Sequence, residues 1–269
     1  MSPKNLTALN KTHNFLLSKL KDKRILNLYK KFENNLKINE NFVVAVSGGP
    51  DSLALTFLTK IYSIKKSLNA KYYIIDHKLR NNSTLEAKYV QKKLKNFSIN
   101  LKILNWIGKK TKKNIQSISR FKRYDLLFDE TKKFKIKNIL LGHHLDDVFE
   151  NFFIRILRGS GLNGLVSLDK ISKINNINLI RPLLDFNKKD LIYISKYIFG
   201  SYIKDPSNND EKFKRVKVRN FLKILENEGL DKDKFLLTIK NLKFANESIN
   251  FYTNKNLKEN VTLFKKKNF

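Results

Sequence analysis

Short apolar runs alternate along this chain with longer segments in which apolar residues recur at helical spacing. The short runs predict four strands, at 42–46, 71–76, 101–104 and 138–142. The longer segments predict helices at 13–32, 53–62, 83–94, 116–134 and 145–158. Strands that alternate with helices form mostly parallel sheets that are covered on both faces. The pattern therefore predicts an α/β, Rossmann-like domain whose ligands bind at the carboxyl ends of the strands.

The alternation weakens after residue 168. Residues 168–186 predict a loop with one short extended segment, and 188–199 predict a helix with Asn187 as its cap. A predicted turn at 205–210 is followed by helical, strongly basic sequence that ends with three lysines at 265–267. We therefore predict a principal domain at 1–204 and a basic helical extension at 205–269.

The first strand ends in the residues SGGPDS, at 47–52. Gly48 and Gly49 allow the backbone to turn sharply, and Asp51 or Ser52 is expected to cap the next helix. A strand, a glycine turn and a helix start form a cradle for an anion, of which phosphate is the commonest. A tight turn without a ligand is the alternative.

Other polar residues also follow predicted strands. Asp76 and His77 follow the second strand, and His143 and His144 follow the fourth, so three of the four histidines lie at strand ends. This placement favours a ligand site there. His143 and Asp147 are also spaced as zinc or manganese ligands on a helix could be, which is an alternative to a substrate-binding role. Within the next predicted helix, Ser83 and Glu86 have the spacing of a capping box.

The composition narrows the function further. A formal net charge of +31 favours a polyanionic partner such as nucleic acid, although the codon bias of an AT-rich genome is an alternative source of lysine. The chain contains no cysteine, which excludes disulfides, cysteine zinc sites, iron–sulfur clusters and thiol catalysis from these residues. It has no apolar run long enough for a membrane span and no signal peptide, so we expect a cytoplasmic protein without a membrane partner.

Several motifs together resemble a known family. The loop at 47–52 lacks the GxxxxGK[ST] pattern and instead resembles the SGGxDS loop of the PP-loop ATP pyrophosphatases. Between about residues 40 and 225 the chain resembles the tRNA(Ile)-lysidine synthetase family in the order of its motifs: SGGPDS, DHKLR at 76–80, SRFKRY at 119–124, GHHLDDVFEN at 142–151, RGSGLNGL at 158–165, RPLLD at 181–185, and DPSN at 205–208 followed by Arg215 and Arg219.

The resemblance implies an adenine nucleotide alpha hydrolase-like fold and a two-step reaction. ATP, with Mg²⁺, would adenylate the wobble cytidine of the isoleucine tRNA whose anticodon is CAU, and free lysine would then displace AMP to form lysidine. Reading of the codon AUG would change to AUA. Residues 1–204 would form the catalytic domain, residues 205–269 would bind tRNA, and the protein could form a homodimer as family members often do.

The same resemblance suggests roles for individual residues. Those expected to bind ATP are Ser47, Gly48, Gly49, Pro50, Asp51, Ser52, Asp76, His77 and His143. The expected catalytic residues are Asp51, which would also bind Mg²⁺, Arg120, Asp147 and Glu150, and the last two would hold lysine. The expected tRNA contacts are Arg123, Arg158, Lys214, Arg215, Lys217 and Arg219. Solvated surface charge is the alternative for the arginines at 120 and 123 and for the run 214–219.

The chain also departs from the family pattern. Val148, Asn151 and Val216 replace the usual Gln, Thr and Asn, and from the 269 residues we expect no room for the further C-terminal domain of longer members. Three other classes compete with this interpretation. The absence of cysteine argues against tRNA thiolation enzymes, the basic charge argues against amidating synthetases of the NAD or GMP type, and the intact SGGPDS loop argues against an RNA-binding protein without catalysis.

Overall fold

The computed structural model describes residues 3–79, 82–107, 115–206 and 210–261. The chain divides into two compact units. The first unit comprises Met1–Asp147 and Lys170–Pro206, and the second comprises Val148–Asp169 and Ser207–Phe269. The predicted domains, 1–204 and 205–269, stay a functional prediction, because compactness does not show which segment binds ATP or RNA.

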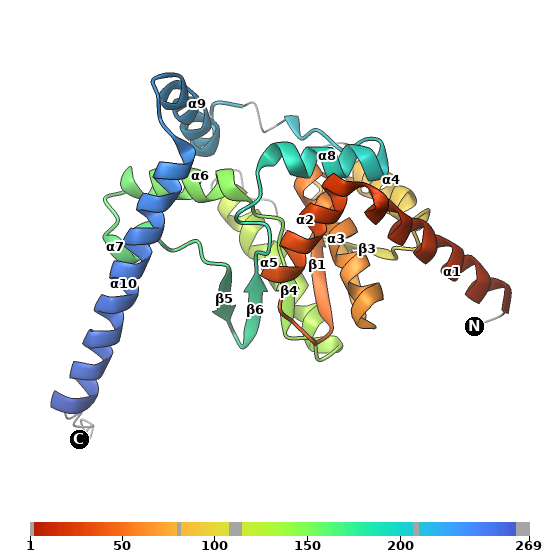
Figure 1. Ribbon diagram of the computed structural model, residues 1–269, viewed down its shortest axis with the longest axis horizontal. Helices are drawn as coiled ribbons and strands as arrows, with labels where there is room; N and C mark the ends of the chain where they lie inside the picture. Colours follow the sequence, from red (N-terminus) through yellow and green to blue (C-terminus); the bar gives the residue numbers. More distant parts are fainter. Residues whose placement is uncertain (1–2, 80–81, 108–114, 207–209, 262–269) are drawn as a thin grey trace. The chain divides into compact units, whose positions relative to one another are not determined.

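The first unit is built on a six-stranded sheet, drawn as arrows in Figure 1. Its strands lie in the order β3-β2-β1-β4-β6-β5. Every neighbouring pair is parallel except β5 and β6, which are antiparallel. The bounds are β1 (Phe42–Val46), β2 (Ala70–Asp76), β3 (Leu101–Asn105), β4 (Asn138–Leu140), β5 (Ile171–Ile174) and β6 (Ile177–Ile180). The predicted mostly parallel α/β sheet is confirmed.

Helices cover both faces of this sheet. Their bounds are α1 (Pro3–Ser18), α2 (Lys23–Asn35), α3 (Pro50–Lys66), α4 (Ser83–Lys95), α5 (Ile115–Lys133) and α8 (Lys188–Phe199). The single helix predicted at 13–32 is wrong, because α1 and a short 3-10 turn end before Asp22. The Asp22 side chain accepts a hydrogen bond from the backbone N–H of Ile25 and so caps a separate helix, α2.

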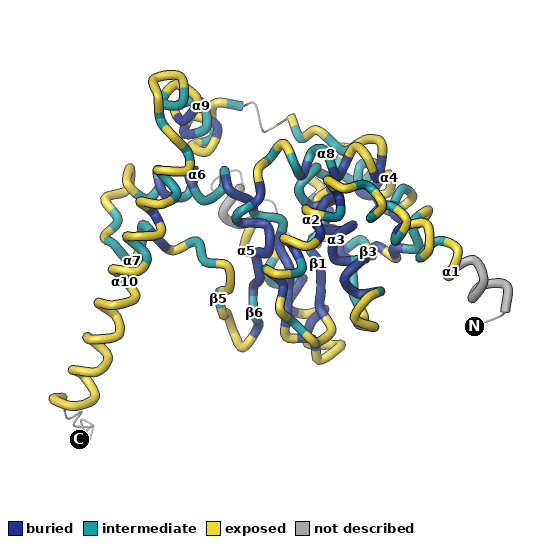
Figure 2. Tube along the Cα trace, in the orientation of Figure 1, coloured by how far each residue is buried: buried dark blue, intermediate teal, exposed yellow. Residues whose placement is uncertain are grey.

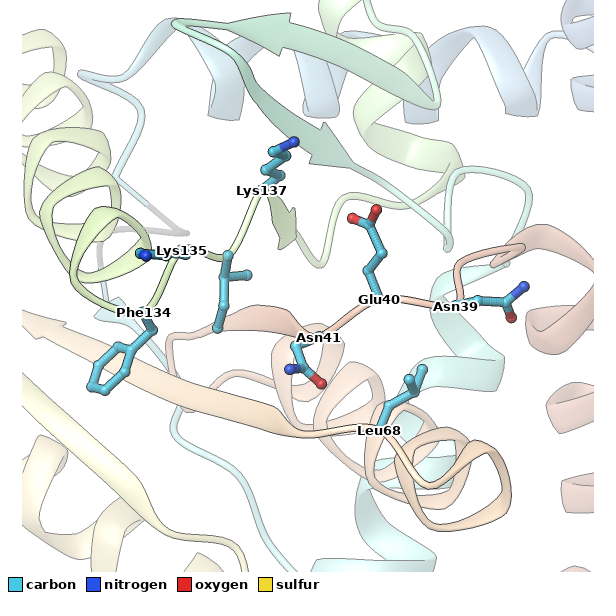
Figure 3. A pocket seen from close by; sticks show the side chains of 8 residues that line it. Asn39, Glu40, Asn41, Leu68, Phe134, Lys135 and Lys137 are labelled. Atoms are coloured by element: carbon cyan, nitrogen blue, oxygen red, sulfur yellow. The ribbon is translucent and has the colours of Figure 1, made fainter.

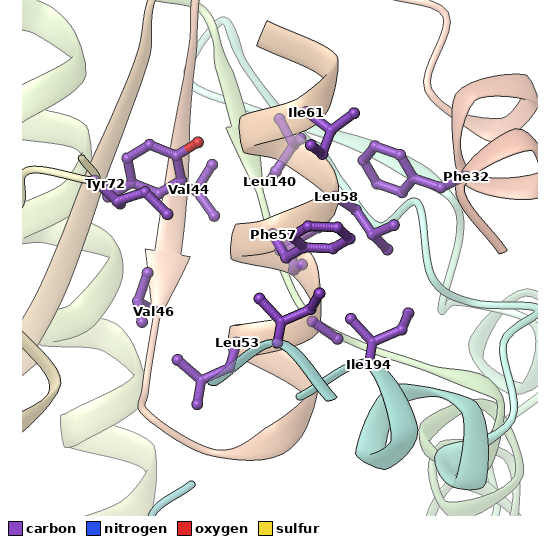
Figure 4. Close-up of a cluster of buried hydrophobic side chains, with 14 of the residues drawn as sticks. Phe32, Val44, Val46, Leu53, Phe57, Leu58, Ile61, Tyr72, Leu140 and Ile194 are labelled. Carbon is purple, nitrogen blue, oxygen red and sulfur yellow. The ribbon is translucent and has the colours of Figure 1, made fainter. Parts of the chain in front are cut away.

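Alternate side chains of the strands enter two different cores. Phe42, Val44 and Val46 of β1 join a cluster with side chains of α2, α3, α4 and α8 (Figure 4). Val43 points to the opposite face, where it packs with Leu127 and Phe128 of α5. Because β1 lies inside the sheet and is apolar on both faces, helices pack against it on both sides. Figure 2 shows this strand as buried.

The antiparallel strands β5 and β6 form a hairpin that the sequence analysis missed. Asn175 and Asn176 connect them, and both have positive φ angles, of 48° and 63°. Two consecutive residues with positive φ form the type of turn that matches the twist of a two-residue hairpin, and asparagine tolerates it better than most residues. The pair NN between the two apolar runs was the available signal.

The second unit is helical. It contains α6 (Leu145–Ile156) from Val148 onward, α7 (Leu162–Leu165), α9 (Lys214–Asn227) and α10 (Lys232–Asn260). Phe149, Phe152 and Phe153 of α6 all pack their rings against Phe235 of α10. The later half of α10 is exposed along its length (Figure 2). Within the described part of the chain, no helix combines the length and the apolar character needed to cross a bilayer.

Candidate active site

The glycine loop after β1 is held by close packing. Gly48 has a φ of +82°, and a Cβ atom built on it would lie 2.7 Å from Cγ2 of Val90 and 3.1 Å from Cδ1 of Ile203. Its carbonyl oxygen accepts a hydrogen bond of 2.9 Å from the backbone N–H of Ile203. A residue with a side chain would be strained by both the φ angle and the contact, so glycine is required here.

The helix α3 begins at the end of this loop. Gly49 is its N-cap and Pro50 its first residue, so the expectation that Asp51 or Ser52 caps the helix is wrong. Proline starts the helix earlier because its φ angle is already helical and it has no N–H to leave unpaired. The Ser52 hydroxyl instead braces the loop, since it accepts from the backbone N–H of Ser47 at 3.1 Å and donates to the carbonyl oxygen of Gly49 at 3.0 Å.

The segment after β4 approaches the first turn of α3 closely. A Cβ atom on Gly142 would lie 3.3 Å from the backbone nitrogen of Ser52 and 3.4 Å from the carbonyl carbon of Asp51. Only a residue without a side chain lets two backbones come this near without a shift. Gly142 therefore sets the distance between the SGGPDS loop and the residues GHHLDD, a role that the sequence analysis did not assign.

His144, rather than His143, brings two carboxylates of the site together. Its Nδ1 accepts a hydrogen bond from the backbone N–H of Asp146, so the neutral ring carries its proton on Nε2. Nε2 lies 3.7 Å from Oδ2 of Asp51 and 3.8 Å from Oδ2 of Asp147. Asp147 also accepts from the backbone N–H of His144 at 2.9 Å, which anchors the start of α6. The structure thus places Asp51 and Asp147 at the same imidazole.

Asp51 has a second partner that the sequence analysis missed. The Nζ atom of Lys188, the first residue of α8, lies 2.7 Å from Oδ1 and 2.6 Å from Oδ2 of Asp51. The two residues are 137 positions apart, so no local pattern could have paired them. The sequence indicated that a helix beginning with lysines follows RPLLD, but it did not indicate that one of these lysines contacts Asp51.

Asp76, at the end of β2, is buried within a group of hydrogen-bond donors. It accepts from the hydroxyl groups of Ser83 and Thr84 and from the backbone N–H of Lys78. Burial alone would raise the pKa of Asp76, but these donors outweigh it and leave the pKa below its ordinary value. The Ser83 hydroxyl is directed at Asp76 and the N-cap of α4 is Asn82, so the predicted capping box is wrong.

His77 follows Asp76 and is neutral at physiological pH. Burial and the charge of Arg123 lower its pKa to about 4, against the opposing influence of Asp76. Its ring packs edge-on against Trp106, and among the described residues neither ring nitrogen has a hydrogen-bond partner. A neutral imidazole with one donor and one acceptor suits recognition of an uncharged polar ligand group.

The remaining arginines predicted in the first unit lie on α5. Arg120 and Arg123 are exposed, and the Arg120 guanidinium lies 6.0 Å from the ring centroid of Tyr124. The influence of Arg123 on the pKa of His77 places it beside the end of β2. His143 is half-buried at the end of β4.

In the second unit, Glu150 is buried and paired with Arg219. The Nε and Nη2 atoms of Arg219 both lie 2.8 Å from Oε1 of Glu150, whose side chain is only 3% exposed. Arg219, expected to contact tRNA, therefore holds α9 to α6. The other predicted tRNA contacts in this unit are exposed: Arg158, Lys214, Arg215 and Lys217.

Parts of some predicted motifs lie outside the described residues. These are Arg80 of DHKLR, the residues at 207–209 of the predicted turn, and the lysines at 265–267.

The donor set around Asp51 is compatible with magnesium but not with a transition-metal cluster. Among the described residues, no three His, Asp or Glu side chains come close enough to hold a metal ion. The zinc or manganese alternative at His143 and Asp147 therefore lacks a third protein ligand there. Magnesium typically takes one or two carboxylates and completes its shell with phosphate oxygens and water. Asp51 is a carboxylate of this kind, but both of its oxygens contact the ammonium group of Lys188, which magnesium would have to displace from at least one of them.

Two surface cavities lie away from this site. One, of about 370 Å³, is shown in Figure 3 and is lined by residues that precede β1 and β4, such as Glu40 and Lys137. The other, of about 670 Å³, lies beside α4 and the start of β3. Both are near the amino ends of strands, whereas SGGPDS and GHHLDD follow the carboxyl ends.

The loop, its helix and the residues at the strand ends define a nucleotide-binding α/β domain. A family model for the PP-loop domain matches residues 18–225, and the chain belongs to this family. It is also similar to proteins named tRNA(Ile)-lysidine synthase. It is 44% identical over 195 residues to that of Orientia tsutsugamushi, 36% over 217 residues to that of Wolbachia pipientis wMel, and 33% over 220 residues to that of Bradyrhizobium diazoefficiens.

These alignments cover 71%, 80% and 81% of this chain and 42%, 50% and 61% of the respective relatives. The chain thus spans about half the length of the curated relatives it matches. Among solved structures, the U34-tRNA thiolase NcsA from Methanococcus maripaludis with its [4Fe-4S] cluster aligns with a TM-score of 0.69 and 18% identity. That alignment covers 83% of this chain and 79% of the thiolase, and it supports the fold.

Proposed function

We propose that this protein is an ATP-dependent ligase that attaches lysine to the wobble cytidine of tRNA(Ile) with a CAU anticodon. The observation that carries the proposal is the glycine loop at 47–52, which leads into the N-terminus of α3, in a chain that is 33–44% identical to several tRNA(Ile)-lysidine synthases. The product, lysidine, would change decoding from AUG to AUA. The reaction would take place in the cytoplasm, and the enzyme could act as a homodimer.

In the first step, the oxygen at position 2 of the cytosine attacks the α-phosphorus of ATP. The new O–P bond forms as the bond between the α-phosphorus and the bridging oxygen breaks, and pyrophosphate leaves. The backbone N–H groups of Gly49 and the first turn of α3 would hold the departing group, because they are unpaired at a helix N-terminus. Mg²⁺, when bound, would offset the negative charge on the phosphates. Asp76, His77 and His143, which follow β2 and β4, are proposed to line the ATP site.

In the second step, the ε-amine of lysine attacks carbon 2 of the cytosine and AMP leaves. The ordinary pKa of that amine is about 10.4, so a base must accept a proton as the bond forms. Asp147 is the proposed carboxylate for holding lysine, and Arg120 is proposed to contact the reacting phosphate. Glu150, the other predicted carboxylate, would have to leave its ion pair with Arg219 to take part. Arg123, Arg158 and the exposed basic residues of α9 are proposed to contact the tRNA backbone.

Mass spectrometry of nucleosides tests this function directly. A CAU-anticodon tRNA(Ile) transcript is incubated with the protein, ATP, Mg²⁺ and isotopically labelled lysine, and then digested to nucleosides. We expect lysidine carrying the label, and none when ATP is omitted, when the methionine tRNA with the same anticodon is used, or with the Asp51→Asn variant. Label-free cytidine in every reaction, with intact protein and tRNA, would refute the proposal.

A further inference from the structure

We propose that Lys188 is a ligand for the β- and γ-phosphates of ATP and that Asp51 positions its ammonium group for this purpose. The inference rests on the proposed use of ATP. It adds a residue from the helix α8 to a phosphate site otherwise formed by the SGGPDS loop and the start of α3.

The geometry places the ammonium group beside the cradle. Its Nζ atom lies within hydrogen-bond distance of both carboxylate oxygens of Asp51, which is the second residue of α3. The side chain of Lys188 remains 36% exposed and that of Asp51 24% exposed, so the pair is open to a ligand. An ammonium group has three N–H donors, and among the described residues Asp51 is the hydrogen-bond partner of Lys188. At least one donor is thus left for a phosphate oxygen.

Local electrostatics favour an anion with more than one negative charge. The N-termini of α3 and α8 each contribute positive partial charge, and Lys188 and Lys189 add two full charges in the first turn of α8. A cation is unfavourable at that end of a helix. Asp51 supplies one compensating charge, while Asp190 of the same turn is paired with Arg24 at 2.8 Å. A pyrophosphate or triphosphate group would supply the missing negative charge.

A structural role alone does not explain the position of the ion pair between Lys188 and Asp51. Helices α3 and α8 already pack through buried apolar side chains, among them Leu53 of α3 with Leu191 and Ile194 of α8 (Figure 4 labels Leu53 and Ile194). Ion pairs that are exposed to this extent contribute little to stability. The Lys188–Asp51 bridge is therefore not needed to hold the two helices together, and its position at the cradle is better explained by ligand binding.

Calorimetric titration with three ligands tests the proposal. ATP, pyrophosphate and AMP, each with Mg²⁺, are titrated into the wild-type protein and into Lys188→Ala, Lys188→Met and Lys188→Arg. Lys196→Ala is the matched control, because it removes an exposed lysine from the last turn of the same helix. Lys188→Met keeps most of the aliphatic stem, so it serves if the alanine variant does not fold.

Loss of the charge-assisted hydrogen bond from Lys188 should weaken the binding of ATP and pyrophosphate more than the binding of AMP. We expect the Kd values for ATP and pyrophosphate to rise about 10- to 100-fold in Lys188→Ala and Lys188→Met, with AMP affected less than about twofold. Lys188→Arg should recover part of the affinity, and Lys196→Ala should change no Kd by more than about twofold.

Two results would overturn the inference while leaving the proposed function intact. One is unchanged ATP and pyrophosphate binding in Lys188→Ala with lysidine still formed by the wild type. The other is equal weakening of AMP and ATP, which would indicate a general change in the fold. If the wild-type protein binds no ATP, both the inference and the proposed function are overturned.

Discussion

Replacing Gly48 with alanine tests how tightly the phosphate loop is packed. The substitution forces a side chain onto a backbone with φ of +82°, which costs about 1–2 kcal/mol for an L-residue. The new Cβ would also lie 2.7 Å from Cγ2 of Val90. Overpacking of this kind adds about 1–3 kcal/mol. The lower entropy of the unfolded alanine chain returns about 0.4–1 kcal/mol, so the net decrease in unfolding free energy should be about 1–4.6 kcal/mol.

A control and a second-site change separate the two causes. Gly229, after the end of α9, also has a positive φ, of +96°, but no atom within 4 Å of its added Cβ, so Gly229→Ala should cost only the backbone term, about 1 kcal/mol. Val90→Ala removes the methyl group that obstructs the new side chain. In a double-mutant cycle, Gly48→Ala should therefore be about 1–2 kcal/mol less damaging in the Val90→Ala background.

The measurement is urea unfolding followed by circular dichroism at pH 7, with the midpoint and slope fitted for each of the variants. Equal destabilisation by Gly48→Ala and Gly229→Ala would refute the packing argument, as would a cycle with no coupling between positions 48 and 90.

Three further predictions concern other parts of the molecule. Arg219→Ala should lower the unfolding free energy, measured by urea unfolding, by about 1–3 kcal/mol. The loss should be smaller than for a fully buried pair because the side chain of Arg219 is 40% exposed, and the further change Glu150→Gln should restore part of the lost stability. Below pH 6.5 the unfolded chain binds a proton at His77 that the folded chain, with a pKa of about 4, does not. Stability should therefore fall as the pH is lowered from 6.5 to 4. The urea midpoint of the wild type minus that of His77→Gln should decrease over the same range, and a difference that does not change with pH would contradict the prediction. When alanine replaces Lys214, Arg215 and Lys217, filter binding of tRNA at several salt concentrations should show weaker affinity. The slope of log affinity against log salt should become flatter by about 0.7–0.9 for each phosphate that the protein no longer neutralises, whereas an unchanged slope would indicate solvated charge only.

Local pattern was sufficient to predict most of the sheet. The apolar run at 42–46 could be placed as an inner strand because its residues are apolar on both faces of the strand, and each face enters a core. The bounds of this strand are confirmed. The predicted helix boundaries and caps were wrong where the hydrogen bond of a single polar side chain determines which local structure forms. Asp22 starts a new helix inside an apolar periodic segment, and Ser83 donates to Asp76 instead of capping α4. Such choices depend on partners that a short window does not contain.

The candidate site could be predicted only where neighbouring residues in the sequence determine the local structure. The SGGPDS loop contains its own turn and helix-start residues, so the sequence indicated the glycine turn and the helix after it directly. The contact of Asp51 with Lys188 depends on how α8 packs on α3, and the approach of Gly142 depends on the order of β1 and β4 in the sheet. Periodicity contains no information on either arrangement. Glu150 was placed on the correct helix, but its burial against Arg219 required knowledge of α9.

The aromatic contacts of α6 affect how the chain emerges from the ribosome. Phe149, Phe152 and Phe153 pack on Phe235, so α6 is synthesised well before the helix that covers it. Roughly 90 residues must be added in between, which takes about 5 to 18 s at typical translation rates. During that interval the nascent chain presents three uncovered phenylalanines, a surface that chaperones bind and that promotes aggregation. A message truncated before α10 would leave this face permanently uncovered, so the yield of soluble protein depends on translation reaching the last helix.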